Sequence, residues 1–190
     1  MNLHKPDVKI TSAEEALQFL KEGNERFVKG ELSTKDTYEE DRNTLSGGQV
    51  PYAIVLCCAD SRVAPEIYFD QKLGDIFVIR NAGNVVDDVV LGSIEYGAEH
   101  LGSPLVVVVG HTSCGAVTAA CSGGELPRNI QAIVKKIAPS VEEGKSVNEV
   151  AAANAKAMVE EILNDEIIQH LGTKVVPAVY DILTGEVSWL

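Results

Sequence analysis

The sequence has few basic residues for its length. Its 16 lysines and arginines stand against 28 aspartates and glutamates, which gives a formal net charge of -12 at neutral pH. A chain this acidic repels the phosphate backbone of nucleic acids and the anionic surface of membranes. We therefore expect neither nucleic acid nor a membrane among its partners.

Long hydrophobic runs are also missing, and cysteines number only four. No stretch approaches the roughly 18 apolar residues of a membrane-spanning helix, and residues 1–10 lack the apolar segment of a secretory signal. These absences predict a cytoplasmic location. In that compartment the four cysteines are expected to be reduced thiols, either buried or bound to a metal, rather than disulfides.

Internal repeats, low-complexity tracts and Pro/Ser-rich linkers are absent as well, so we expect a single domain over residues 1–190. Within it, residues 1–48 are expected to form an N-terminal helical arm and residues 49–190 an α/β core. Ser12 with Glu15 has the form of a capping box, and apolar residues then recur at helical spacing to about Lys29. The polar segment from 30 to 49 is expected to pack on the rest of the molecule or on a partner subunit.

The core alternates short apolar runs with segments of helical period. The runs at 52–58, 75–81 and 105–111 are typical of buried parallel strands, and 175–182 could add another. Residues 87–101, 129–138 and 147–171 have helical periodicity. This alternation predicts an α/β fold with a mainly parallel central sheet flanked by helices. Ligands of such sheets bind beyond the carboxyl ends of the strands, which places function in the loops after Cys58 and Gly110.

Those two loops contain a candidate metal site. His111 and Cys114 form an H-x-x-C pair where a strand is expected to end and a helix to begin, and Cys58 ends the neighbouring strand. Two thiolates and one imidazole favour zinc over magnesium or calcium. The backbone at Gly115 can approach a ligand closely because glycine has no side chain.

Whether another side chain closes the metal shell decides between a structural and a reactive site. Cys57 should point to the opposite face of its strand, and Cys121 lies about 10 Å along a helix from Cys114, so both are predicted to be core thiols. His4, His100 and His170 are expected to be solvated or hydrogen-bonded.

Asp60 is the remaining candidate for the fourth position. It lies two residues after Cys58 and could point to the same side of the chain. Arg62 could hold this carboxylate away from the metal through two parallel hydrogen bonds. In the alternative interpretation, Arg62 pairs with Glu66 and Asp60 only caps the short helix that follows.

Residues 58–62 read CADSR and residues 111–114 read HTSC. This pair of strings resembles the two signatures of the β-class carbonic anhydrases, C-x-D-S-R and H-x-x-C, and the resemblance extends from about residue 49 to 120, including RNAGN at 80–84. It implies one zinc ion per chain and a dyad beside the open zinc position. The implied ligands are Cys58, His111 and Cys114, and the implied dyad is Asp60 with Arg62.

The sequence is most similar to the plant-type branch of that family. The resemblance implies a substrate pocket formed by Gln49, Phe77 and Tyr96, built at the interface of a homodimer that can pair further into a dimer of dimers. A subgroup regulated by bicarbonate has a Trp three residues before the first zinc cysteine, where this chain has Val55. The regulatory pocket is therefore expected to be absent and the active site to be open.

The implied activity is reversible hydration of carbon dioxide to bicarbonate and a proton by a zinc-bound hydroxide, which Asp60 would orient. Gln49 would donate a hydrogen bond to a substrate oxygen. Two alternatives stay open. Relatives with the same zinc ligands hydrolyse carbonyl sulfide or carbon disulfide, and a non-catalytic protein could use Asp60 as a permanent fourth ligand that makes the zinc structural or stored.

Overall fold

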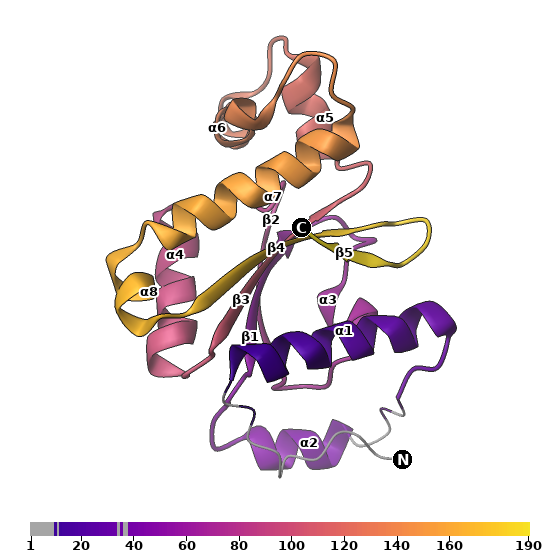
Figure 1. Ribbon diagram of the computed structural model, residues 1–190, viewed down its shortest axis with the longest axis vertical. Helices are drawn as coiled ribbons and strands as arrows, with labels where there is room; N and C mark the ends of the chain where they lie inside the picture. The colour runs from indigo at the N-terminus through magenta and orange to yellow at the C-terminus, as the bar shows by residue number, and fades with distance from the viewer. Residues whose placement is uncertain (1–9, 11, 34, 36–37) are drawn as a thin grey trace.

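The computed structural model describes residues 10, 12–33, 35 and 38–190. Five strands in this part of the chain form one sheet in the order β2-β1-β3-β4-β5 (Figure 1). The first four are parallel, and β5 pairs antiparallel with β4. The expected mainly parallel sheet is confirmed, and β5 is an addition to it. The strands are β1 (Ala53–Cys58), β2 (Ile76–Asn81), β3 (Leu105–His111), β4 (Lys174–Tyr180) and β5 (Val187–Trp189).

Both faces of the sheet are covered, which explains why β1 and β3 are apolar at nearly every position. Alternate side chains enter two separate cores. In β1, Ile54, Leu56 and Cys58 face one core, whereas Val55 and Cys57 face the other. The prediction that Cys57 and Cys58 point to opposite faces is confirmed.

Helices cover the two faces unequally (Figure 1). On one face, α7 packs along β3 and β4, and α4 and α5 lie beside it. On the other face, α1 lies against α3, β1 and β3. The helices are α1 (Ala13–Lys29), α2 (Tyr38–Leu45), α3 (Pro65–Tyr68), α4 (Asp88–Glu95), the π-helix η1 (Tyr96–His100), α5 (Gly115–Ser122), α6 (Arg128–Ile137), the 3-10 helix η2 (Ala138–Ser140), α7 (Val147–Leu163) and α8 (Glu166–Leu171).

Two of the expected helices are interrupted. The segment from 87 to 101 is α-helical only to Glu95 and continues as the π-helix η1. The segment from 147 to 171 divides into α7 and α8 because the Asp165 carboxylate accepts hydrogen bonds from the N–H groups of Ile167 and Ile168 and so caps a new helix. No helix among the described residues is long and apolar enough to cross a membrane.

The N-terminal helix α1 packs on its own chain. Ser12 caps it by accepting a hydrogen bond from the N–H of Glu15, as the capping box predicts. The helix comes so close to the core that a Cβ on Gly23 would lie 1.8 Å from the Phe69 carbonyl oxygen. By contrast, α2 has no buried residue. Packing of the arm on a partner subunit stays a prediction.

Asn24 fixes α1 to the core. Its buried side chain donates to the carbonyls of Tyr68 and Gly185 and accepts from the N–H of Val187, at 2.8–3.0 Å. Replacing Asn24 with Ala leaves these buried backbone groups without partners, so we expect the free energy of unfolding to fall by about 2–4 kcal/mol. Chemical denaturation followed by fluorescence measures this loss, because Trp189, the single tryptophan, packs beside α1 with the Lys21 ammonium over its ring.

Gln18 provides the matched control. It also lies on α1, but among the described residues its side chain bonds Glu22 at the exposed surface. Gln18→Ala should leave the unfolding free energy within about 0.5 kcal/mol of the original protein. Equal losses in the two variants would show that Asn24 does not anchor the helix.

Candidate metal centre

Three side chains that are distant in the sequence meet at the carboxyl edge of the sheet. Cys58 is the last residue of β1, His111 is the last residue of β3, and Cys114 directly precedes α5. Because β1 and β3 are parallel neighbours, their ends lie at the same edge. The ligand atoms of the three residues all lie within 4.8 Å of one another, and all three residues are buried.

The donor atoms fit a tetrahedral zinc ion. The sulfurs of Cys58 and Cys114 are 4.0 Å apart, and two zinc–sulfur bonds of about 2.3 Å at a tetrahedral angle would place them about 3.8 Å apart. His111 Nδ1 donates to the Thr112 carbonyl at 2.9 Å, so its Nε2 is the free acceptor. That Nε2 is buried without a hydrogen-bond partner, which is the state of a ligand atom directed at a metal.

A strained turn brings Cys114 back toward His111. Ser113 has φ of 56°, an unusual value for a residue other than glycine. The Asn148 side chain stabilises this conformation by accepting the Ser113 N–H at 2.9 Å. The Thr112 hydroxyl accepts the N–H of Ile182, which ties the same turn to the chain after β4. The short H-x-x-C spacing is therefore held by both α7 and the C-terminal segment.

The two adjacent thiols of β1 differ in chemistry because they face different surroundings. The sulfurs of Cys58 and Cys114 share one proton between them, and the N–H of Gly83 lies 3.4 Å from Cys58 Sγ, so the pKa of one thiol of the pair, Cys58, is lowered while that of its partner Cys114 is raised. Burial among apolar side chains raises the pKa of Cys57 to about 12. Cys58 is thus suited to bind a metal as a thiolate, whereas Cys57 stays a neutral core thiol.

Asp60 and Arg62 form a bidentate ion pair beside the three ligands. Arg62 Nε and Nη2 donate to the two carboxylate oxygens at 2.9 and 2.8 Å, and the Arg62 N–H donates at 3.0 Å. These bonds hold the pKa of the Asp60 carboxyl well below its usual range. The alternative pairing of Arg62 with Glu66 is not what the structure shows.

Of the expected pocket residues, Gly115 lies beside the three-residue cluster, whereas Phe77, Tyr96 and Gln49 lie away from it. Phe77 on β2 and Tyr96 at the start of η1 face each other with ring centroids 6.2 Å apart. Because Phe77 precedes Asn81, the register partner of Cys58, by four residues, it lies about 13 Å along the strand from the metal ligands of the same chain. Gln49 is exposed in the turn before β1, and Gly115 begins α5 next to Cys114.

Comparison with known proteins identifies the family. Residues 53–187, most of the chain, match the family described as carbonic anhydrase. The chain belongs to the β-class carbonic anhydrase family. It is 52% identical over 134 residues to carbonic anhydrase 2 of Mycobacterium tuberculosis, a match that covers 68% of this chain and 65% of that protein. The β-class assignment predicted from CADSR and HTSC is confirmed, and the plant-type branch stays a prediction.

Solved β-carbonic anhydrases share the fold. The enzyme CafA of Aspergillus fumigatus superposes with a TM-score of 0.72 at 26% identity, covering 93% of this chain and 89% of that one. A β-carbonic anhydrase of Sordaria macrospora, described as tetrameric, gives a TM-score of 0.74 at 23% identity, covering 93% and 97%. These structures show that the chain has the β-carbonic anhydrase fold.

Other candidate ligands are separate from this β-carbonic anhydrase site. Cys121 is partly buried against the core and lies outside the cluster. His100 is exposed beside Tyr96 and Glu99, and His170 is exposed in the last turn of α8. His4 lies outside the described residues.

Residues around the ligands could not be found from their spacing in the sequence. Arg80 is the clearest case, because its guanidinium donates to the Cys58 carbonyl at 2.9 and 3.0 Å and to the Asp60 carbonyl at 2.8 Å. It fixes the backbone of a candidate metal ligand, Cys58, and of Asp60, whose carboxylate pairs with Arg62. Its place in the RNAGN string was the available signal, but only the parallel pairing of β1 with β2 gives it this contact.

Proposed function

We propose that this protein is a zinc-dependent carbonic anhydrase that interconverts carbon dioxide and bicarbonate. The observation that carries the proposal is a buried Cys58–His111–Cys114 cluster whose histidine presents a free Nε2, in a chain of the β-carbonic anhydrase family. The cluster would hold one zinc ion per chain and leave a fourth position for water. When bound, zinc lowers the pKa of water to about 7 and so supplies hydroxide at neutral pH.

Asp60 and Arg62 would orient the reaction. An ionised Asp60 accepts a hydrogen bond from the attacking water and thereby aims an oxygen lone pair at the carbon of carbon dioxide. The bidentate contact with Arg62 keeps this carboxylate ionised and restricts its movement toward the metal ligands. Neither residue needs to change protonation state near neutral pH, since the pKa of Asp60 is far below that range.

We further propose that the active site is completed in a homodimer, which can pair into a dimer of dimers. Phe77 and Tyr96 form an apolar wall about 13 Å along the strand from Cys58 of the same chain. Tyr96 is 48% exposed, and β2 is an edge strand. In a dimer, this wall and the Gln49 amide would line the substrate pocket beside the zinc site of the second copy. Gly115 has no side chain, so it would leave room for substrate beside Cys114.

Stopped-flow measurement of carbon dioxide hydration tests the proposal. We expect the rate to rise across about pH 6.5 to 9, where zinc-bound water ionises. The same preparation is then assayed for sulfide release from carbonyl sulfide, because the zinc ligands alone do not distinguish the two substrates. Negligible hydration with rapid sulfide release would replace our assignment by a carbonyl sulfide hydrolase.

A metal-dependent fold without any hydration in that pH range would instead support a structural zinc protein. The Asp60–Arg62 pair argues against this third function, because both carboxylate oxygens are already bonded to the guanidinium.

The proposed dimer has its own test, which is the hydration rate of the protein as a monomer. A monomer with the full hydration rate would contradict a pocket formed by two copies of the chain, but it would not contradict the zinc chemistry.

A further inference from the structure

The β2–α4 loop, residues 82–87, supplies a hydrogen-bond donor to one metal ligand. The N–H of Gly83 points at Cys58 Sγ, with a nitrogen–sulfur distance of 3.4 Å. Metal-bound thiolates are commonly tuned by such outer contacts, because an N–H donor withdraws charge from the sulfur. The direction of the Gly83 N–H therefore affects the charge on the sulfur of Cys58, a proposed metal ligand.

Gly83 is held on its remaining sides. Its carbonyl oxygen accepts a hydrogen bond from Asn154 Nδ2 at 2.9 Å. Its φ is +80°, and a Cβ there would lie 2.8 Å from Ile137 Cδ1 and 3.1 Å from the Ala116 Cβ. Only glycine suits this position, and since glycine itself leaves the backbone free to rotate, the hydrogen bond from Asn154 is what holds the peptide in place.

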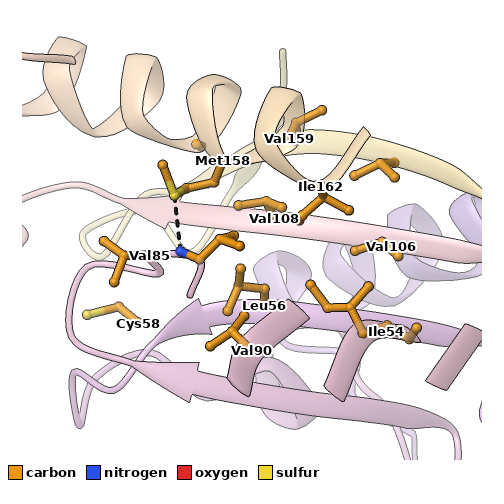
Figure 2. Packing of buried hydrophobic residues seen from close by; sticks show 14 of the residues in the cluster. Ile54, Leu56, Cys58, Val85, Val90, Val106, Val108, Met158, Val159 and Ile162 are labelled. Atoms are coloured by element: carbon orange, nitrogen blue, oxygen red, sulfur yellow. Dashed lines mark hydrogen bonds between the residues drawn. The ribbon is translucent and has the colours of Figure 1, made fainter. Parts of the chain in front are cut away.

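The contact with Asn154 belongs to a larger attachment of the loop to α7. Met158, one turn after Asn154, accepts the N–H of Val86 at its sulfur, 3.1 Å away. Figure 2 shows this bond from Met158 on α7 to the loop that carries Val85. Two consecutive turns of one helix thus hold the backbone that faces the ligand.

Asn154 is an unusual residue for its surroundings. It is fully buried on a helix face whose neighbours Val150, Ala151 and Met158 enter the apolar core. Its Nδ2 donates to Gly83, but its Oδ1 has no hydrogen-bond partner among the described residues. A half-satisfied buried amide costs stability that an apolar residue would avoid. The donated bond to Gly83 is the contact that an apolar residue could not provide.

We propose that Asn154 is a positioning residue of the metal centre, which keeps the Gly83 N–H directed at the Cys58 thiolate, with Met158 supporting the same loop. This inference rests on the proposed zinc site. It extends the site from its three ligands to the helix behind them, through a chain of contacts from α7 to Gly83 to Cys58 Sγ.

The test is Asn154→Leu, which keeps the side-chain shape and removes the donor. We expect zinc affinity, measured by competition with a chelator, to fall about 10-fold or more. In the cobalt-substituted protein we expect the sulfur-to-metal charge-transfer band to move to longer wavelength, because a thiolate without its N–H donor gives up an electron more easily. A purely structural role would lower thermal stability without moving this band.

Two further variants make the result decisive. Met158→Leu keeps the packing but removes the sulfur that accepts the Val86 N–H. We expect it to lower zinc affinity and to move the cobalt band to longer wavelength, each by less than Asn154→Leu does. It also serves as the test if Asn154→Leu does not fold. Ile162→Val, a buried change on α7 away from the loop, should lower thermal stability only. An unmoved band and unchanged affinity in Asn154→Leu, or in Met158→Leu if the first does not fold, would overturn the inference. Failure of the original protein to bind metal would instead overturn the zinc site.

Discussion

Replacing Cys58 with Ser is expected to remove most of the zinc and nearly all of the carbon dioxide hydration. A serine hydroxyl does not ionise near neutral pH, so the site would keep one thiolate and one imidazole. Changes in outer contacts already weaken metal binding by about 10- to 100-fold, and loss of a direct ligand should exceed that range. Without zinc to acidify water, we expect less than about 1% of the hydration rate to remain.

Metal analysis of the purified protein and stopped-flow assays measure the two losses separately. Cys57→Ala is the matched control, because Cys57 is the adjacent residue of the same strand but faces the opposite core. It should retain a full complement of zinc and its hydration rate. His111→Ala should behave like Cys58→Ser, since it removes the only nitrogen ligand. Full zinc content in Cys58→Ser would rule out the proposed ligand set.

Asp60→Asn is expected to keep the zinc and lose most of the activity. The amide is nearly the same size as the carboxylate, but it has one acceptor oxygen in place of two and no charge, so it cannot bind Arg62 in the same bidentate way. An attacking water that is no longer oriented typically costs about 100-fold in rate. We therefore expect kcat to fall by about that factor, with zinc content unchanged.

Arg62→Lys separates orientation from charge. A lysine ammonium keeps the positive charge but cannot form two parallel bonds with a carboxylate, so we expect an intermediate loss of kcat. The pKa of Asp60 should rise in this variant, because the guanidinium contact is the main cause of its depression. Carboxyl NMR titration measures that rise.

The outcome that would contradict the role of this pair comes from the first variant. If Asp60→Asn kept the full hydration rate, Asp60 would not orient the attacking water.

Much of the core could be predicted from local sequence patterns. The runs ending at Cys58 and His111 are apolar at nearly every position because their strands are covered on both faces, and that pattern alone predicts buried parallel strands. The capping box at Ser12 predicted the start of α1 for an equally local reason. The strand β5 and the break between α7 and α8 were missed, because a three-residue strand and a single capping aspartate give weak periodic signals.

The three proposed ligands could also be found from the sequence, because two strand ends and an H-x-x-C turn predict that Cys58, His111 and Cys114 lie close together, as they do in the structure. The surroundings of those ligands were decided by the tertiary structure. Arg80 reaches the Cys58 carbonyl because β2 pairs beside β1, and Asn154 reaches Gly83 because α7 crosses that edge of the sheet. Such contacts join residues 22 and 71 positions apart, and hydrogen bonds at that separation leave no periodic or motif signal in the chain. The sequence thus determines which atoms can bind the metal, and the packing of distant elements determines how firmly they are held.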